Sequence, residues 1–121
     1  MIKILTIDDE SEFTSLIEAY FSIRGFEVLV AHHGDEGLRL AKDKKPEVCL
    51  IDLKMPGLHG DAVLKEICNH IPEARCIMIT ASEGGGKTRS GLMAMGAVAC
   101  FDKPLMSLKD LEQKIREVLT L

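Results

Sequence analysis

The sequence predicts an α/β fold in which a parallel sheet is covered by helices on both faces. Short apolar runs rich in Ile and Val each lead into polar loop residues, which is typical of buried strands. Segments with helical periodicity separate these runs, and such alternation favours parallel strands joined by helical crossovers. The four clearest runs are Ile4–Ile7, Val48–Ile51, Ile77–Ile79 and Val98–Phe101.

The first half of the chain is expected to contain two helices and one further strand. The first helix should run from about Ser11 to Gly25, a residue type that often follows a helix end. The further strand is expected at Phe26–Ala31, and a second helix at Gly34–Lys45 ends in lysines that suit a helix C-terminus. With the spacing of a single buried face, the first helix should bury Phe13, Leu16, Ile17, Tyr20 and Phe21.

The second half is expected to contain three helices. The first runs from about Gly60 to His70, and a short one from about Lys87 to Met95 follows a glycine-rich loop. The last helix should open at Ser107, whose hydroxyl can cap it. The stripe of this helix that faces the core is predicted to contain Leu108, Leu111, Ile115 and Val118.

Composition limits the classes of protein that the chain can represent. Its 121 residues fit a single domain, which we expect to span residues 1–121 without an output domain. A net charge of −4 argues against direct binding of nucleic acid. An acidic start at Asp8–Glu10 argues against a signal peptide, and no apolar stretch approaches the roughly 20 residues that span a bilayer.

The cysteines show no paired spacing that would suggest a zinc site. Cys49 and Cys100 lie inside strand-like runs, where cysteine acts as a small apolar residue. We therefore expect Cys49, Cys68, Cys76 and Cys100 to be free thiols, and a reducing cytoplasm as the location.

Polar residues whose side chains could take part in a reaction follow four of the predicted strands. Asp8 and Asp9 follow the first, Asp52 follows Val48–Ile51, and Thr80 and Lys103 follow the last two. Because parallel strands open their carboxyl ends on one edge, these groups should converge there. Three adjacent carboxylates call for a cation, and oxygen ligands select Mg²⁺ or Mn²⁺. The set is typical of phosphoryl transfer to a carboxylate.

Each of these residues has an ordinary structural explanation when taken alone. An Asp pair after a strand is a common helix cap, and Lys103 before a proline could lie in a solvated turn. Their joint occurrence at four strand ends, in the right order, favours a functional site.

The chain resembles the receiver domain of two-component response regulators over essentially its whole length. The residues that carry the resemblance are Asp8-Asp9, Asp52, Met55-Pro56-Gly57 with Gly60, Thr80-Ala81 and Lys103-Pro104. The resemblance implies a flavodoxin-like (βα)5 fold with five parallel strands in the order 2-1-3-4-5.

The resemblance also implies a role for each residue of the site. Asp52 would accept a phosphoryl group from a histidine kinase or a histidine phosphotransfer protein. Asp9, Asp52 and the backbone carbonyl of Lys54 would hold Mg²⁺, with Asp8 acting mainly through water. Thr80 and Lys103 would contact the phosphoryl oxygens, and the Lys103–Pro104 bond would be cis. Such a domain assists its own phosphorylation and dephosphorylation and is not otherwise an enzyme.

The last strand departs from the family pattern. Most receivers carry a switch aromatic three positions before the lysine, where this chain has Cys100. Phe101 is one residue out of register and should face the opposite side of the sheet. We therefore hypothesise that signalling runs through Gly84–Gly86 and the following short helix. Contacts with an effector or a second copy are expected on the face of the fourth helix, fifth strand and fifth helix.

Two enzymatic alternatives fit the sequence less well. A P-loop would require glycine at Ala81, and a haloacid-dehalogenase-like phosphatase would require aspartate at Lys54. Whether the chain is a stand-alone regulator or the receiver of a longer transcriptional regulator stays open at this point.

Overall fold

The computed structural model describes residues 1–81 and 89–120 as alternating strands and helices. The strands and helices follow the predicted alternation, and the glycine-rich segment Gly84–Gly86 lies outside the described residues. In chain order the elements are β1 (Ile2–Ile7), α1 (Ser11–Ser22), β2 (Phe26–Ala31), α2 (Gly34–Lys44), β3 (Val48–Ile51), α3 (Gly60–His70), β4 (Arg75–Thr80), α4 (Arg89–Ala94), β5 (Ala99–Asp102) and α5 (Leu108–Leu119).

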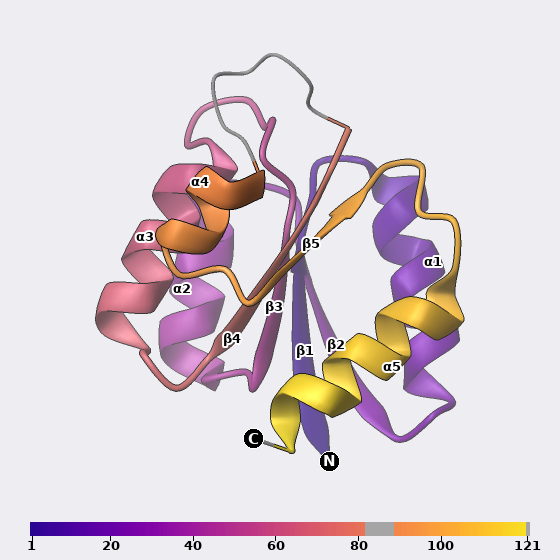
Figure 1. The fold of residues 1–121 in the computed structure, drawn as a ribbon. Helices are drawn as coiled ribbons and strands as arrows, with labels where there is room; N and C mark the ends of the chain where they lie inside the picture. The colour runs from indigo at the N-terminus through magenta and orange to yellow at the C-terminus, as the bar shows by residue number, and fades with distance from the viewer. Residues whose placement is uncertain (82–88, 121) are drawn as a thin grey trace.

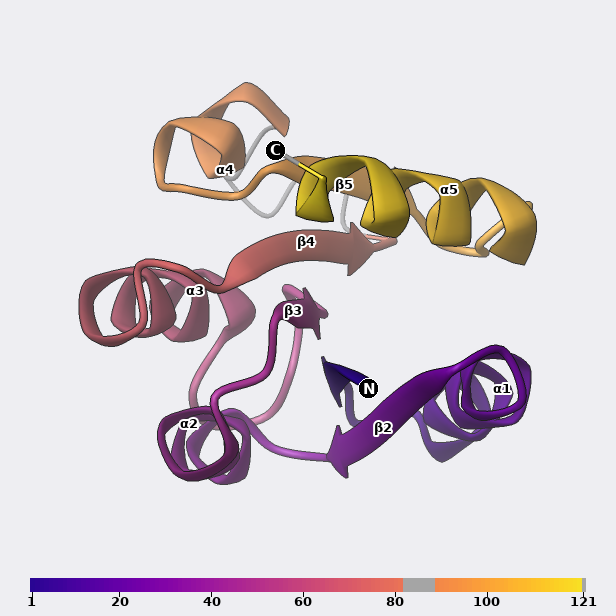
Figure 2. The same cartoon turned by 90° about the horizontal axis from the view of Figure 1, so that it is seen from below.

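The five strands form one parallel sheet, as the sequence pattern predicted, in the order β2-β1-β3-β4-β5 that the family resemblance implied. Helices α1 and α5 cover one face, and α2, α3 and α4 cover the other (Figures 1 and 2). Each face has its own apolar core, since alternate strand residues point to opposite sides. None of the described helices is long and apolar enough to cross a bilayer.

Helix α1 differs from the prediction at its end and on one side. It ends at Ser22 instead of near Gly25, and the amide of Arg24 bonds back to the carbonyl of Phe21 at 3.0 Å. Ile17 and Phe21 are buried as predicted, but Leu16 is 48% exposed. The sheet and α5 cover only part of the helix circumference, so its apolar stripe extends past the covered arc.

Backbone pairing extends β1, β4 and β5 beyond their predicted apolar runs. β1 begins at Ile2, two residues before its predicted start. β4 begins at Arg75, which pairs with Val48, and ends at Thr80, which pairs with Asp102. β5 therefore begins and ends one residue later than predicted. Ladder hydrogen bonds need only the main chain, so polar residues at the ends of an apolar run can join the sheet.

The last helices agree with the sequence where the structure describes them. Helix α4 starts at Arg89, and residues 87 and 88 of the predicted helix lie outside the described part of the chain. The hydroxyl of Ser107 accepts a hydrogen bond from the amide of Asp110 at 3.0 Å, which caps α5 as predicted. Leu111, Ile115 and Val118 are buried, and Leu108 packs against the same core.

The four cysteines and Phe101 lie as the sequence predicted, with free thiols and with Phe101 facing away from Cys100. All four cysteines fall in the described part of the chain, and all are free. Cys100 packs against the core beneath α2–α4, and Phe101 against the core beneath α1 and α5. The two residues therefore face opposite sides of β5, and Phe101 is partly buried where it packs against its core.

Thr6 is the one polar side chain that the sheet buries without a hydrogen bond among the described residues. It is fully buried in β1, and its Oγ1 has no hydrogen-bond partner. A buried hydroxyl without a partner costs free energy that an apolar group of the same shape does not. We expect Thr6→Val to raise the free energy of unfolding by about 1 kcal/mol in urea denaturation.

Thr14 provides a matched control for that substitution. It is equally buried, but its hydroxyl donates to the carbonyl of Ser11 at 3.1 Å. Thr14→Val should therefore destabilise the protein. A loss of stability in Thr6→Val would show that the hydroxyl of Thr6 is satisfied in solution.

Candidate functional site

A cavity of about 260 Å³ opens at the carboxyl ends of the central strands. Five of the residues predicted for the site line it, together with Glu10 and Ala81. The five are Asp9, Asp52, Lys54, Thr80 and Lys103. Asp8 lies buried beside the cavity, where it contacts Lys103. The convergence predicted from the strand ends is therefore present in the fold.

Backbone hydrogen bonds hold the key residues just past the strands. The amide of Asp8 donates to the carbonyl of Ala31 at 3.0 Å, and that of Asp52 donates to the carbonyl of Ile7 at 3.0 Å. The amide of Lys103 reaches the carbonyl of Thr80 at 3.2 Å. These three residues are thus anchored to neighbouring strands, which fixes where their side chains leave the sheet.

Gly60 lets the backbone at the start of α3 pack closely against the residues that follow β3. Its amide donates to the carbonyl of Leu53 at 2.8 Å. A Cβ at this position would overlap the carbonyl oxygen of Asp52 and crowd the backbone of Leu53. Only glycine fits at this position, because two backbones approach closely directly behind Asp52.

The ammonium group of Lys103 is the centre of the site. Its Nζ lies 2.6 Å from Oδ2 of Asp8, 2.6 Å from Oε1 of Glu10 and 3.8 Å from Oδ2 of Asp52. It also lies 4.6 Å from the ring centroid of Phe13 on α1. The Lys103 side chain is only 9% exposed. The peptide bond from Lys103 to Pro104 is cis, as the resemblance implied.

Glu10 is the site residue that sequence reasoning missed. Its backbone amide donates to Oδ1 of Asp8 at 2.9 Å, and its carboxylate reaches Lys103. Carboxylate oxygens of Asp8, Glu10 and Asp52 lie within 4.8 Å of one another, whereas Asp9 lies at the cavity wall. The acidic run Asp8–Glu10 was visible in the sequence, but the turn that directs Glu10 towards Lys103 was not.

Burial and charge shift the protonation of these groups. Burial raises the pKa of Asp52 to about 6, the charge of Asp8 adds to the rise, and Lys103 opposes it. Burial also raises the pKa of Asp8, against the hydrogen bond from Lys103. Burial would lower the pKa of Lys103, but the hydrogen bonds to Asp8 and Glu10 outweigh it and raise the pKa. The lysine is therefore a fixed cation.

The raised pKa of Asp52 means that its ionised carboxylate lowers the free energy of unfolding. Such a carboxyl favours the fold at low pH, and this contribution is lost as the pH rises from its ordinary value of 3.8 past about 6. We expect Asp52→Asn to raise the free energy of unfolding by about 2 kcal/mol at pH 8 without divalent ions. The gain should vanish towards pH 4, as denaturant titrations at several pH values can show.

Asp43→Asn is the matched control for this pH dependence. Asp43 is an exposed residue whose carboxylate lies 3.9 Å from Nζ of Lys44, so its replacement should change stability by less than about 0.5 kcal/mol. A gain for Asp52→Asn that is independent of pH would contradict the role given to its charge.

The donor set at the cavity fits a hard divalent cation. It consists of carboxylate oxygens from Asp8, Asp9, Glu10 and Asp52, with the backbone of Lys54 at the same wall. Such ligands select Mg²⁺ or Mn²⁺ over metals that prefer sulfur or nitrogen. The raised pKa of Asp52 also fits a cation site. Burial and the charge of Asp8 disfavour the charged form of this carboxyl, and a bound cation would favour it.

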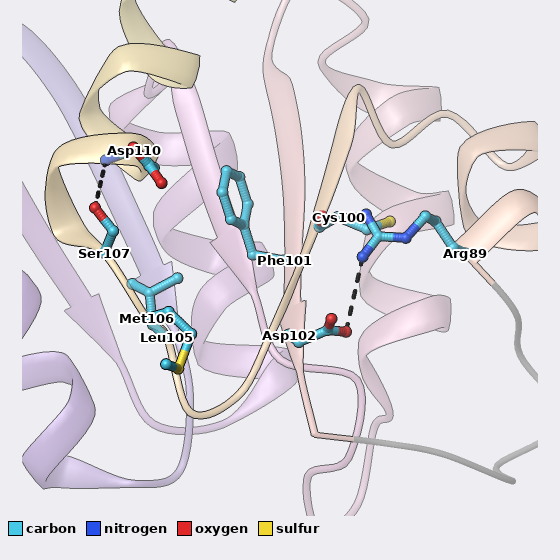
Figure 3. Close-up of a pocket in the computed structure, with 8 residues that line it drawn as sticks. All are labelled: Arg89, Cys100, Phe101, Asp102, Leu105, Met106, Ser107 and Asp110. Atoms are coloured by element: carbon cyan, nitrogen blue, oxygen red, sulfur yellow. Dashed lines mark hydrogen bonds and ion pairs between the residues drawn. The ribbon is translucent and has the colours of Figure 1, made fainter.

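A second hollow of about 200 Å³ lies on β5 between α4 and α5 (Figure 3). The guanidinium of Arg89 hydrogen-bonds the carbonyl of Cys100 and lies 3.7 Å from the carboxylate of Asp102. Met106 is 89% exposed at its rim, and Met93 of α4 is 42% exposed. Exposed methionine suits surfaces that adapt to a partner.

The fold and the acidic edge together define a flavodoxin-like α/β domain whose site lies at the carboxyl ends of its strands. Residues 4–116 match the family described as the response regulator receiver domain. The chain belongs to this family of signalling domains.

Relatives and solved structures agree with this assignment. A probable transcriptional regulator ycf27 of Porphyridium aerugineum is 38% identical over 97% of this chain and 48% of its own length. The transcriptional regulatory protein CpxR of Klebsiella pneumoniae is 36% identical over 98% of this chain and 50% of its own length. The chain thus spans about half the length of these curated relatives.

A CheY-like receiver domain protein from Methanospirillum hungatei superposes with a TM-score of 0.92 at 27% identity, covering 99% of this chain and 94% of that one. The response regulator domain of Thermotoga maritima CheB gives a TM-score of 0.87 at 28% identity, covering 100% and 98%.

Proposed function

We propose that this receiver accepts a phosphoryl group on Asp52 from the phosphohistidine of a histidine kinase or a histidine phosphotransfer protein. The observation that carries the proposal is a nearly buried carboxylate at the cavity wall with a buried ammonium 3.8 Å away. An oxygen of Asp52 attacks the phosphorus while the bond from phosphorus to the donor nitrogen breaks. The product is an acyl phosphate.

The neighbouring residues stabilise the charge that this transfer brings into the cavity. Lys103 supplies a fixed positive charge to the phosphoryl oxygens, and the hydroxyl of Thr80, at the same cavity, supplies a hydrogen bond. Mg²⁺, when held by Asp9, Asp52 and the carbonyl of Lys54 with Asp8 acting through water, would neutralise further charge on the phosphoryl group.

We propose that residues 1–121 form one receiver domain that serves as the input of a regulator. The full-length relatives are transcriptional regulators about twice as long, which favours a DNA-binding output over a stand-alone role. The net charge of −4 argues that the receiver itself does not contact nucleic acid. Free thiols fit a reducing cytoplasm as its location.

Output is proposed to pass through the face formed by α4, β5 and α5. The hollow between Arg89, Phe101 and Met106 lies on this face and is the place for an effector or a second copy to dock (Figure 3). Its link to the phosphorylation site is short, because β5 leads directly into Lys103.

Incubation with acetyl phosphate and Mg²⁺ tests the proposal. Intact-protein mass spectrometry should show one added phosphoryl group on the wild-type protein, and none when a chelator removes the metal. An unmodified wild-type protein under conditions that label another receiver would contradict it.

A further inference from the structure

The contact between Lys103 and Glu10 has a consequence for phosphoryl acceptance. Two carboxylates, from Asp8 and Glu10, each lie 2.6 Å from Nζ of Lys103. An ammonium has three N–H donors, so these two contacts occupy most of its capacity. Asp52 lies further away, at 3.8 Å. A phosphoryl group on Asp52 must therefore compete for a lysine that is already paired.

We propose that Glu10 holds Lys103 in the unphosphorylated protein and gives it up when the phosphoryl group arrives. Glu10 is thus a positioning residue that acts through Lys103 and limits how readily Asp52 is modified. The inference rests on the proposed function, since it assumes that Asp52 is the acceptor.

Burial decides which of the two carboxylates can be exchanged. The side chain of Asp8 is 2% exposed and also accepts a hydrogen bond from the backbone amide of Glu10. Its carboxylate cannot leave the lysine without becoming a buried, unpaired charge. The side chain of Glu10 is 63% exposed, so its carboxylate can turn into water at little cost. Glu10 is therefore the partner that Lys103 releases.

The charge of Glu10 acts in the same direction as the contact. Glu10 lines the cavity that the donor phosphate has to enter. Its carboxylate repels an anionic donor and neutralises part of the charge that Lys103 would otherwise present. Both effects oppose phosphoryl binding and neither takes part in the bond changes at Asp52. Replacing Glu10 should therefore favour the phosphorylated form.

Beryllofluoride, which mimics the phosphoryl group on an aspartate, gives a readout that does not depend on turnover. We expect Glu10→Gln to bind it about fivefold more tightly than wild type in NMR titrations, which is the effect of losing about 1 kcal/mol of ion pairing. With acetyl phosphate, the donor concentration that gives half the maximal rate should fall by a similar factor. Each protein is compared at its own saturating Mg²⁺ concentration, measured separately.

Two further variants separate the contact from the charge. Glu10→Asp keeps the charge but shortens the side chain, and we expect it to shift in the same direction as Glu10→Gln because the contact is lost. Glu12→Gln removes an exposed charge in the first turn of α1, away from the cavity lining, and should behave as wild type.

The outcomes distinguish this inference from the proposed function. Two results would contradict the proposal that Lys103 leaves Glu10 for the phosphoryl group. One is that Glu10→Gln binds beryllofluoride no more tightly than wild type, and the other is that Glu10→Asp behaves as wild type. A wild-type protein that binds no beryllofluoride would instead overturn Asp52 as the acceptor.

Discussion

Asp52→Asn should abolish covalent phosphorylation by acetyl phosphate. An amide cannot attack phosphorus as a carboxylate does, so the acyl phosphate cannot form at this position. Asparagine has nearly the same shape, and removal of a costly buried charge should leave the fold at least as stable. Intact-protein mass spectrometry should therefore show one added phosphoryl group on wild type and none on a folded variant.

The controls for this result concern the other carboxylates. Asp35→Asn removes an exposed charge in the first turn of α2 and should be labelled as wild type. Asp9 and Glu10 line the same cavity as Asp52, so the labelled wild-type peptide must be mapped to Asp52. Labelling of Asp52→Asn at an unchanged level would assign the acceptor to a different residue.

The sequence predicts the sheet and the edge where the candidate site lies, because the strands can be recognised from simple periodicity. Apolar runs mark buried strands, parallel strands open on one edge, and the polar residues after Ile7, Ile51 and Phe101 must then lie near one another. Strand order and the cis bond before Pro104 came from the family resemblance instead. Burial of Asp52 follows from its place directly after the central strand β3.

The features that the sequence does not predict depend on the path of turns and on how much of each helix is covered by its neighbours. Glu10 reaches Lys103 because of the path of the chain between β1 and α1, and no residue pattern encodes that path. Leu16 has the spacing of a buried residue but lies beyond the arc that the sheet and α5 cover. Periodicity gives the direction of a side chain, whereas the neighbours that meet it are set by tertiary packing.

Lys103→Met should be the most destabilising single substitution at the site. The side chains of Asp8 and Asp52 are 2% and 7% exposed, and Lys103 is the cation that contacts both. Removing one member of a buried ionic cluster costs about 3–5 kcal/mol, because the charge that is left has no compensation. Since the cavity opens to solvent, we expect about 3 kcal/mol at pH 8 in metal-free buffer, measured by denaturant unfolding.

The pH dependence of the stability lost in Lys103→Met tests whether the loss is electrostatic. Burial raises the pKa values of Asp8 and Asp52, and Lys103 opposes both rises. Without the lysine both pKa values should rise further, so protonation would relieve the repulsion and the loss should shrink towards pH 5. Lys103→Met should also cost less in the Asp52→Asn background, where one of the two charges is already absent.

Lys114→Met separates the loss of a buried cation from the loss of any lysine. Lys114 forms an exposed pair with Glu117 at 3.1 Å on α5, so its replacement should cost less than about 1 kcal/mol at every pH. If Lys103→Met costs no more than this control, Asp8 and Asp52 do not share a charged cluster with Lys103 in solution. The lysine would then be free to meet the phosphoryl group without any exchange of partners.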